Sequence, residues 1–378
     1  VDNPQRFAFF CRAAVDLADF LDWTPDIFHC HDWMAALVPV YLETVARGGR
    51  LRHSASLLTV HNIAYQGYAD HSLLDWAGLP DWLYRSDKME ACGGVNVLKG
   101  GLYFANKLTT VSPGYAQEIR REEFACGLQD VTKFRSGDLI GVLNGIDSKI
   151  WDPATDPHLA ASYDGEHLAG KKVCKSDLCK LYGLRDRPSV PLFGVVSRLC
   201  RQKGLDVLVD AFPWILDTME LQFVLLGAGD WQLEEHFRGL ARTFSDRVSV
   251  HIGYDEALAH RIEAGCDFFL MPSRFEPCGL NQLYSLRYGT LPIVRATGGL
   301  RDTVQNYNEE TGDGTGFLFN DLTPNAIHGT VGWACYAYHN RPDHIETMIR
   351  RAMGMDFSWK ISAQRYRHCY RWALETKR

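Results

Sequence analysis

The chain has 378 residues, of which 46% are hydrophobic and 23% charged, with a formal net charge of −6. These values fit a globular protein of about two to three domains. The negative charge argues against a nucleic-acid-binding protein, and no apolar run reaches the roughly 18 residues that a transmembrane helix needs. The 11 cysteines are odd in number and lack paired CxxC spacing, which favours free thiols in a reducing compartment.

The first part of the chain alternates helix-like and strand-like patterns. Residues 7–21 carry apolar positions at helical spacing, and residues 26–29 and 56–60 read as short strands. Each strand leads into a polar cluster, His29-Cys30-His31-Asp32 after the first and His61-Asn62 after the second. Ligands bind at the carboxyl ends of strands in open α/β sheets, so these clusters predict a binding site.

The cluster at residues 29–32 admits three interpretations. A metal site is the weakest, because neighbouring residues on a strand point to opposite faces and no further ligand cluster accompanies them. A buried pair of structural histidines is the second. The third rests on a family resemblance described below.

A second run of alternating strands and helices begins at residues 190–196. Its first strand leads to Arg198 and Lys203, two cations in a loop before a helix. Arginine chelates phosphate oxygens with two donors and lysine adds a compact charge, so the pair suits a diphosphate. A solvated basic loop is the alternative, and Arg201 between them reads as a surface residue.

Two further loops follow strands in this half. The sequence around Gly229 resembles the start of a dinucleotide fingerprint, but Gln232 replaces the third glycine, so the evidence for NAD is weak. Residues 268–271 read as a strand and residues 282–288 as a helix, an arrangement that aims backbone N–H groups at an anion. Glu276 lies in the loop between them. A carboxylate beside a phosphate is unfavourable unless it binds something such as sugar hydroxyls, so the loop predicts a nucleotide-sugar site. An ordinary loop with a solvated glutamate is the alternative.

The literal string of this loop is specific. Ser-Arg-Phe-Glu-Pro-Cys-Gly-Leu-Asn-Gln-Leu-Tyr, at residues 273–284, closely resembles the signature of bacterial glycogen synthases and plastid starch synthases. His-x-His-Asp-Trp at residues 29–33, Thr-Val-His-Asn at residues 59–62 and the loop at residues 197–204 follow the family's order. Many other retaining glycosyltransferases carry a second glutamate where this chain, like the synthase group, has Tyr284.

The resemblance covers the whole chain and implies an α/β fold with two Rossmann-like domains facing across a cleft (GT-B). We expect an acceptor-side domain at residues 1–160, a nucleotide-sugar-binding domain at residues 161–356 and a final helix at residues 357–378 that returns to the first domain. The family's N-terminal Lys-x-Gly-Gly-Leu strand is not found, because residues 97–102 match an interior helical segment. We therefore expect the first domain to be incomplete at its N-terminus.

The implied activity is transfer of glucose from ADP-glucose to the 4-hydroxyl at the non-reducing end of an α-1,4-glucan, with retention of configuration. No metal or other cofactor, nucleic acid or membrane is implied, and the implied location is a bacterial cytoplasm or a plastid stroma. A fragment that only binds nucleotide or glucan, without turnover, is the alternative.

The resemblance also assigns residues. Asp32 matches an essential acidic residue of the acceptor-side domain, and His61 matches a histidine that contacts the donor glucose. Tyr254 would stack on adenine, with plain core packing as the alternative. The expected catalytic residues are Asp32, His61, Arg198, Lys203 and Glu276. The expected substrate-binding residues are Asn62, Asn144, Gly229, Tyr254, Cys278, Gly279, Leu280, Gly298 and Gly299.

Overall fold

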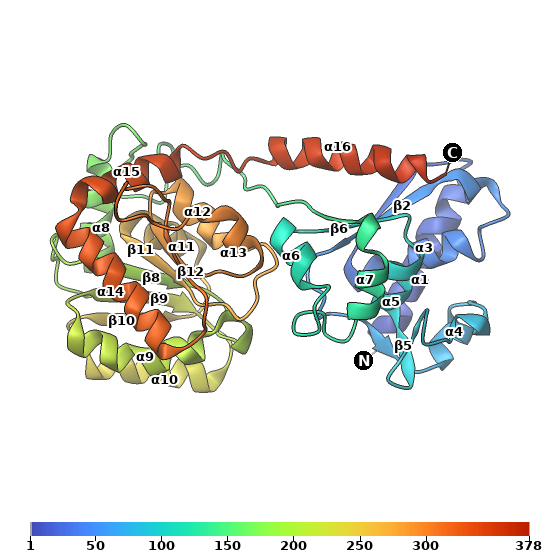
Figure 1. Cartoon of the computed structure of the whole chain (residues 1–378), viewed down its shortest axis with the longest axis horizontal. Coiled ribbons are helices and arrows are strands. Elements are labelled where there is room, and N and C mark those ends of the chain that lie inside the picture. The colour runs from blue at the N-terminus through green and yellow to red at the C-terminus, as the bar shows by residue number, and fades with distance from the viewer. Residues whose placement is uncertain (1, 378) are drawn as a thin grey trace. The chain divides into compact units, whose positions relative to one another are not determined.

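The chain folds into two compact α/β units. The computed structural model describes residues 2–377. One unit comprises Val1–Asn144 with Lys360–Arg378, and the other comprises Gly145–Trp359 (Figure 1). The boundary falls earlier than the expected one at residues 160/161, because Trp151 and Leu159 pack against a core cluster of the second unit.

A parallel four-stranded sheet forms the centre of the first unit. Its strands are β1 (Ile27–His31), β2 (Ala55–Val60), β6 (Lys107–Thr110) and β7 (Leu139–Gly141), in the order β1-β2-β6-β7. Every residue of β2 is buried, as expected for a central parallel strand. Strand β1 extends to His31, two residues beyond the predicted end, so His29 and His31 lie on the same face.

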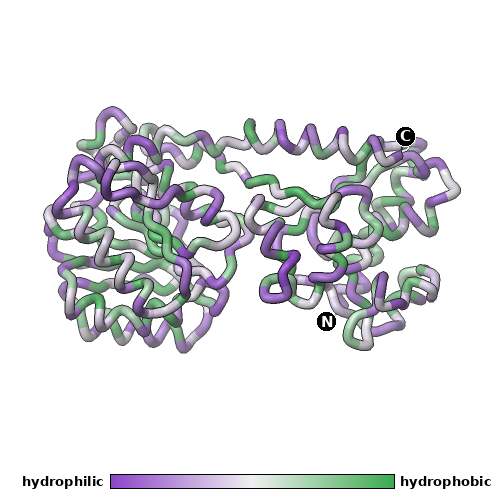
Figure 2. The backbone as a smooth tube through the Cα atoms, in the orientation of Figure 1, coloured by the Kyte–Doolittle hydropathy of each residue, from purple (hydrophilic) through white to green (hydrophobic). Residues whose placement is uncertain are grey.

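Helices cover both faces of this sheet. The helices of the unit are α1 (Asn3–Phe20), α2 (Asp32–Ala35), α3 (Leu37–Glu43), α4 (Ser72–Trp76), α5 (Val97–Phe104), α6 (Pro113–Glu118), α7 (Gln129–Phe134) and α16 (Trp359–Glu375), with short 3₁₀ turns η1 (Arg50–His53), η2 (Asp81–Leu83) and η3 (Ser136–Asp138). A small antiparallel sheet joins β3 (Tyr68–Ala69), β5 (Gly94–Asn96) and β4 (Glu90–Ala91). Cys369 of α16 is buried against Leu57 and Val142, and hydrophobic and hydrophilic stretches alternate along α16 in Figure 2.

The second unit is built on a six-stranded parallel sheet. Its strands are β8 (Leu192–Val196), β9 (Gln222–Gly227), β10 (Val248–Ile252), β11 (Phe268–Met271), β12 (Leu291–Arg295) and β13 (Phe317–Phe319), in the order β10-β9-β8-β11-β12-β13. The strands predicted at residues 190–196 and 268–271 are confirmed as β8 and β11, to within two residues at each end. The chain winds outward from β8 to β10 and then returns to add β11 beside β8. The topological switch point, where ligands bind in such sheets, therefore lies between β8 and β11.

Alternate residues of these strands face two helical layers. Phe193 and Val195 belong to a core with the helices at residues 205–218, 231–243, 324–340 and 342–353, whereas Leu192 belongs to a core with the helices at residues 169–181, 256–265 and 298–303. The helices are α8 (Ala169–Leu181), α9 (Leu205–Thr218), α10 (Trp231–Thr243), α11 (Glu256–Gly265), α12 (Asn281–Arg287), α13 (Gly298–Thr303), α14 (Pro324–Asn340) and α15 (Pro342–Met353), with a 3₁₀ turn η4 (Arg201–Lys203). Within residues 2–377, none of the helices combines the length and apolarity needed to span a bilayer.

Candidate functional site

The loops after β8 and β11 flank the switch point and are tied to each other. The guanidinium of Arg274 donates two hydrogen bonds of 2.6 Å to the carboxylate of Asp206 and one of 2.7 Å to the backbone oxygen of Arg201. The backbone N–H of Arg274 donates to the oxygen of Gln202 over 2.8 Å. The loop with the predicted diphosphate-binding cations is therefore held against the loop that carries Glu276.

Lys203 and Glu276 form an ion pair at this junction. Lys203 Nζ lies 2.6 Å from Glu276 Oε2, and Ser273 Oγ donates to the same oxygen over 3.0 Å. The side chain of Glu276 is 6% exposed, so the interpretation of a solvated glutamate is wrong. A buried carboxylate requires compensation by charge or hydrogen bonds, and Lys203 and Ser273 supply both.

Arg198 and Gly204 delimit the cationic loop. The side chain of Arg198 is exposed, directly after β8. Gly204 has φ of 65°, and a Cβ there would lie 1.9 Å from the backbone oxygen of Pro272. Only glycine allows this close approach, which seats the cationic loop against the start of the Glu276 loop.

The glycines after β11 and β12 pack two loops together. A Cβ on Gly299 would lie 2.1 Å from the backbone oxygen of Cys278, and the Gly299 N–H donates to the oxygen of Glu276 over 3.0 Å. Gly279 has φ of 71° and Gly298 has φ of 44°. The Gly299 amide thus fastens the Glu276 loop in place. Cys278 is buried beneath this junction, and Leu280 is 38% exposed just before α12.

The loop after β9 does not leave the N-terminus of the next helix free to bind a dinucleotide. The carboxylate of Asp230 accepts hydrogen bonds from the amides of Gln232, at 2.8 Å, and Leu233, at 3.3 Å. It caps the first turn of α10, where a dinucleotide fingerprint would present its pyrophosphate. Gly229 instead packs on the β8 loop, since a Cβ there would lie 2.3 Å from the oxygen of Leu199. These contacts disfavour an NAD site.

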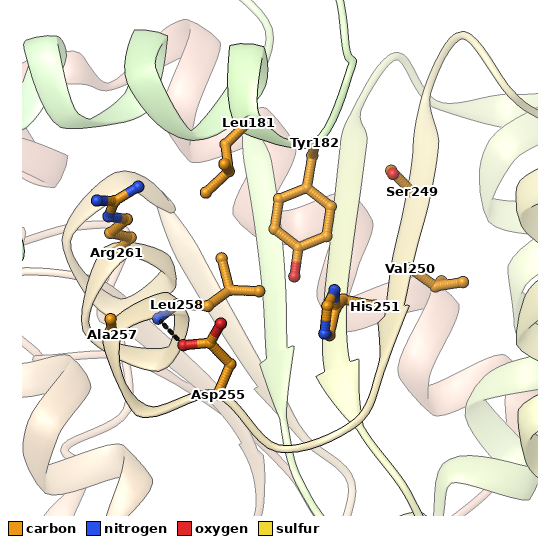
Figure 3. A pocket seen from close by; sticks show the side chains of 9 residues that line it. All are labelled: Leu181, Tyr182, Ser249, Val250, His251, Asp255, Ala257, Leu258 and Arg261. Atoms are coloured by element: carbon orange, nitrogen blue, oxygen red, sulfur yellow. Dashed lines mark hydrogen bonds between the residues drawn. The ribbon is translucent and has the colours of Figure 1, made fainter.

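Tyr254 follows β10 and is 89% exposed. Core packing, the alternative interpretation of this residue, is therefore wrong. A groove of about 400 Å³ runs beside the same loop, between the end of α8, strand β10 and α11 (Figure 3). Tyr182, His251 and Arg261 line it. Among the described residues that line this groove, none is a predicted site residue.

Tyr284 occupies the position where many other retaining glycosyltransferases carry a glutamate, and here it packs against another aromatic ring. Its ring stacks on Trp151 with centroids 3.7 Å apart and an interplanar angle of 11°, and His260 stacks on Trp151 at 3.8 Å and 10°. Asp156 lies 2.6 Å from His260 Nδ1 and accepts from the Tyr288 hydroxyl over 2.5 Å. The segment after Asn144 thereby supports α12, which follows the Glu276 loop.

In the first unit, Asp32 holds the loop after β2. Its Oδ1 accepts hydrogen bonds from the backbone N–H of His61, at 2.7 Å, and of Asn62, at 3.4 Å. Asp32 adopts φ of 55°, a left-handed conformation that is rare outside glycine and often found at functional sites. The Asn62 side chain accepts from the Ala64 N–H over 3.0 Å. The strained aspartate therefore positions the backbone around His61.

Histidines at the carboxyl edge of this sheet are arranged in pairs. His31 Nδ1 lies 2.9 Å from His61 Nε2, while His29 lies 2.7 Å from Thr59 Oγ1 and 3.0 Å from the Tyr370 hydroxyl of α16. Burial, with the neighbouring histidines, lowers the pKa of His29 to about 4 and also lowers the pKa of His31. The His29 contacts fit the interpretation of a structural histidine, and those of His31 do not.

Two other predicted features lie in the first unit. Asn144 is its last residue before the boundary and is half-buried. Lys99 lies inside α5, and its ammonium donates to the backbone oxygens of Ser86 and Glu90 over 2.6 Å each. The Lys-Gly-Gly-Leu string therefore serves helix packing, in agreement with the sequence interpretation.

Sequence reasoning missed several residues at these sites. His31, Ser273 and Arg274 lie within the quoted motifs but received no role. The signal for His31 was its spacing of two from His29 on a strand whose end lies beside His61. The signal for Ser273 was its spacing of three residues from Glu276. For Arg274 the sequence carried no signal, because its partners Arg201 and Asp206 are distant in the chain.

Known protein families match both units of the chain. The family described as "Starch synthase catalytic domain" matches residues 1–134, and "Glycosyl transferases group 1" matches residues 185–335. Glycogen synthase 1 of Geobacter metallireducens is 46% identical over 378 residues, covering 100% of this chain and 75% of that protein. Glycogen synthase of an Anaeromyxobacter species is 49% identical, covering 98% of this chain and 78% of that protein.

Solved structures extend the likeness. The catalytic domain of starch synthase IV from Arabidopsis thaliana, bound to ADP and acarbose, superposes with a TM-score of 0.90 at 38% identity, covering 99% of this chain and 78% of that one. Sucrose-phosphate synthase from Thermosynechococcus elongatus shares the fold at a TM-score of 0.61 and 20% identity, over 97% of this chain and 78% of that one. The predicted α/β class with two Rossmann-like units of GT-B type is confirmed, and the chain belongs to the glycogen synthase and starch synthase family of glycosyltransferases.

Proposed function

We propose that the chain transfers glucose from ADP-glucose to the 4-hydroxyl at the non-reducing end of an α-1,4-glucan, with retention at the anomeric carbon. Family membership and the ADP and acarbose bound to the Arabidopsis relative support this donor and acceptor. The observation that carries the proposal is the Lys203–Glu276 ion pair at the switch point of the second sheet. It joins a cation suited to phosphate with a carboxylate suited to sugar hydroxyls.

On the donor side, the leaving group is a nucleoside diphosphate that gains negative charge as the bond to the sugar breaks. Arg198 and Lys203 would neutralise that charge through charge-assisted hydrogen bonds. Tyr254 offers an exposed ring for the adenine. Gly229, Cys278, Gly279, Leu280, Gly298 and Gly299 form the loop surfaces that we assign to the donor.

Glu276 has two tasks in this proposal. Its Oε2 lies against Lys203 and Ser273, which orient the buried carboxylate. The carboxylate would accept hydrogen bonds from glucose hydroxyls when the donor is bound. Lys203 then turns toward the phosphates, so donor binding redistributes the ion pair.

From the first unit, the family resemblance assigns His61 to the donor glucose and Asn62 and Asn144 to substrate. The backbone oxygen of His61 would stabilise positive charge at the anomeric carbon. Because Asp32 accepts from the amides of His61 and Asn62, we assign it the task of holding this backbone in place.

The test is glucosyl transfer from radiolabelled ADP-glucose to glycogen, with digestion of the product by an exo-hydrolase specific for α-1,4 linkages. We expect labelled glucose that this hydrolase releases, with UDP-glucose a poorer donor. Arg198→Ala should lower transfer at least ~100-fold, because one charge-assisted contact to the leaving group is lost. Transfer at the wild-type rate in Arg198→Ala would remove that residue from the mechanism.

Binding without turnover, the alternative derived from the sequence, is not favoured, because the chain matches glycogen synthases over its whole length. We also propose a reducing compartment, either a bacterial cytoplasm or a plastid stroma. All eleven cysteines are free thiols, which supports such a compartment.

A further inference from the structure

We propose that His31 is a positioning residue that sets the tautomer and the ring orientation of His61. The proposal rests on the proposed function, in which His61 contacts the donor sugar, and it concerns a residue to which the family motif gave no role. It follows from the way that two neighbouring parallel strands end at the same edge of the first sheet.

The backbone brings the edges of the two rings together at the carboxyl end of the sheet, with the ring planes tilted by 35°. His31 is the last residue of β1 and pairs in register with Thr59, and His61 is the first residue after β2. The ring centroids are 5.2 Å apart, and His31 Nδ1 lies 2.9 Å from His61 Nε2. The backbone of His61 is held separately, through the Asp32 carboxylate at 2.7 Å. Backbone and ring of His61 are thus contacted by two consecutive residues, His31 at the end of β1 and Asp32 at the start of α2.

A hydrogen bond between two imidazoles contains one proton, so the tautomer of one ring dictates the tautomer of the other. When His31 Nδ1 donates, His61 carries its own proton on Nδ1. When His61 Nε2 donates, its Nδ1 is an acceptor. In either case the second nitrogen of His61 has a defined role toward a sugar hydroxyl. Without His31, the tautomer of His61 is no longer coupled to that of a neighbouring ring, and its two tautomers exchange independently.

The surroundings favour the neutral form of the His31 ring, which lies at the exposed end of β1. Burial and the neighbouring His61 lower the pKa of His31, while the adjacent Asp32 carboxylate acts in the opposite direction. Another titratable group, His29 on the same strand, packs against the His31 ring, and Tyr366 and Tyr370 of α16 pack in turn against His29. A neutral imidazole donates through one nitrogen and accepts through the other.

His29 does not serve the same purpose, although its ring lies 4.2 Å from that of His31. Both of its nitrogens already lie within hydrogen-bond distance of other groups, Thr59 at 2.7 Å and Tyr370 at 3.0 Å. Thr59 Oγ1 lies 2.6 Å from Thr109 Oγ1 in turn. His29 therefore joins the sheet to α16 and is a natural comparison for His31.

Three substitutions of His31 distinguish a positioning role from a purely structural one. His31→Asn keeps a hydrogen-bonding amide close to the place of Nδ1, His31→Gln moves the amide toward the place of Nε2, and His31→Ala removes both. We expect kcat/KM for ADP-glucose to fall by about 10-fold or more in the Ala and Gln variants, as for residues that orient a functional histidine. His31→Asn should recover to within about 3-fold of wild type. ADP affinity, which we assign to the second unit, should stay unchanged in all three. Equal losses in Asn and Ala, or a fall in ADP affinity, would contradict positioning of His61.

A spectroscopic readout does not depend on turnover. In protein labelled with ¹⁵N-histidine, the two ring nitrogens of His61 should show the separated chemical shifts of a single tautomer at pH 7. In His31→Ala they should move toward each other, as two tautomers exchange. Unchanged His61 shifts in His31→Ala would overturn the inference. Absence of transfer in the wild type would instead count against the proposed function and leave this tautomer result standing.

Discussion

Lys203 Nζ lies 2.6 Å from Glu276 Oε2, and these two side chains are 20% and 6% exposed. The cation follows β8 and the carboxylate follows β11, the two strands that flank the switch point of the sheet. The Arg274–Asp206 contacts hold the two loops at this spacing. Each member of the pair stabilises the other in the free enzyme and acts on a different part of the proposed donor.

Glu276→Gln should therefore change ADP affinity and the rate of glucosyl transfer in opposite directions. Removal of the carboxylate frees Lys203 and takes a negative charge away from the phosphates, so ADP should bind a few-fold tighter, by ~1 kcal/mol. Transfer should fall at least ~100-fold, because the amide replaces the acceptor for the sugar hydroxyls. Calorimetric titration with ADP and the glycogen assay measure the two effects. Weaker ADP binding together with normal transfer would contradict the proposed division of roles.

Lys203→Ala should weaken ADP binding by about 10- to 100-fold, the range for a charge-assisted hydrogen bond. It should also lower the unfolding temperature, because it leaves Glu276 buried without its cation. Arg201→Ala is the matched control, since this exposed residue of the same loop contributes its backbone oxygen to Arg274. Equal loss of ADP affinity in both variants would mean that the loop acts only through its net charge.

Gly299→Ala should damage the junction of the Glu276 and Gly299 loops. The new Cβ would lie 2.1 Å from the Cys278 oxygen, so the loops must separate and the 3.0 Å bond from Gly299 N–H to Glu276 must lengthen or break. We expect a loss of ~2 kcal/mol or more in the free energy of unfolding and weaker ADP binding. Gly329→Ala, in α14, is the control, because an added Cβ there meets no described atom within 4 Å. Similar stability of the two variants would exclude the proposed close packing.

Trp151→Ala should destabilise the second unit by ~2 kcal/mol or more and weaken ADP binding. The substitution removes the ring between His260 and Tyr284, and Tyr284 lies on the helix that follows the Glu276 loop. Trp231→Ala is a control, because Trp231 is 70% exposed. Thermal unfolding and ADP titration measure the effects. Unaltered ADP affinity in Trp151→Ala would show that the stack supports stability alone.

The pH dependence of stability should change in Glu263→Gln. Burial raises the pKa of Glu263 to about 8, while the unfolded chain has the ordinary value of 4.5. The folded state therefore binds more protons between these values, and the contribution of Glu263 to stability is lost as pH rises through about 8. The Gln variant can still accept from Ser285, which donates to Glu263 over 2.6 Å. Wild type and variant should be similarly stable near pH 5, and the variant should be the more stable at pH 9. Parallel pH profiles of the unfolding temperature would show that Glu263 ionises normally.

The repeating patterns of the chain allowed much of the second sheet to be predicted. Buried parallel strands read as short apolar runs, and β11 matches its predicted bounds of 268–271. Because each strand ends in a loop that carries polar residues, Arg198, Lys203 and Glu276 could be placed at one edge of the sheet in advance. The sequence motifs then identified the family, which the comparisons confirm.

The remaining features depend on contacts between distant residues. The boundary after Asn144 arises because Trp151 and Leu159 pack against a core of the second unit, and a local composition change cannot reveal that. Likewise, Gly299 is required because a Cβ there would meet the backbone oxygen of Cys278. Asp32 is important because it accepts a hydrogen bond from the backbone N–H of His61, just after β2. Residue spacing predicts which edge of a sheet a side chain occupies but not which atom it meets there.

A crystal structure of the chain with ADP bound tests the central claim most directly. The account predicts that the diphosphate lies at the switch point between β8 and β11, with phosphate oxygens within ~3 Å of the side-chain nitrogens of Arg198 and Lys203. The Lys203–Glu276 distance should be longer than the 2.6 Å of the free chain. ADP bound elsewhere, with its phosphorus atoms far from Arg198 and Lys203, would contradict the account.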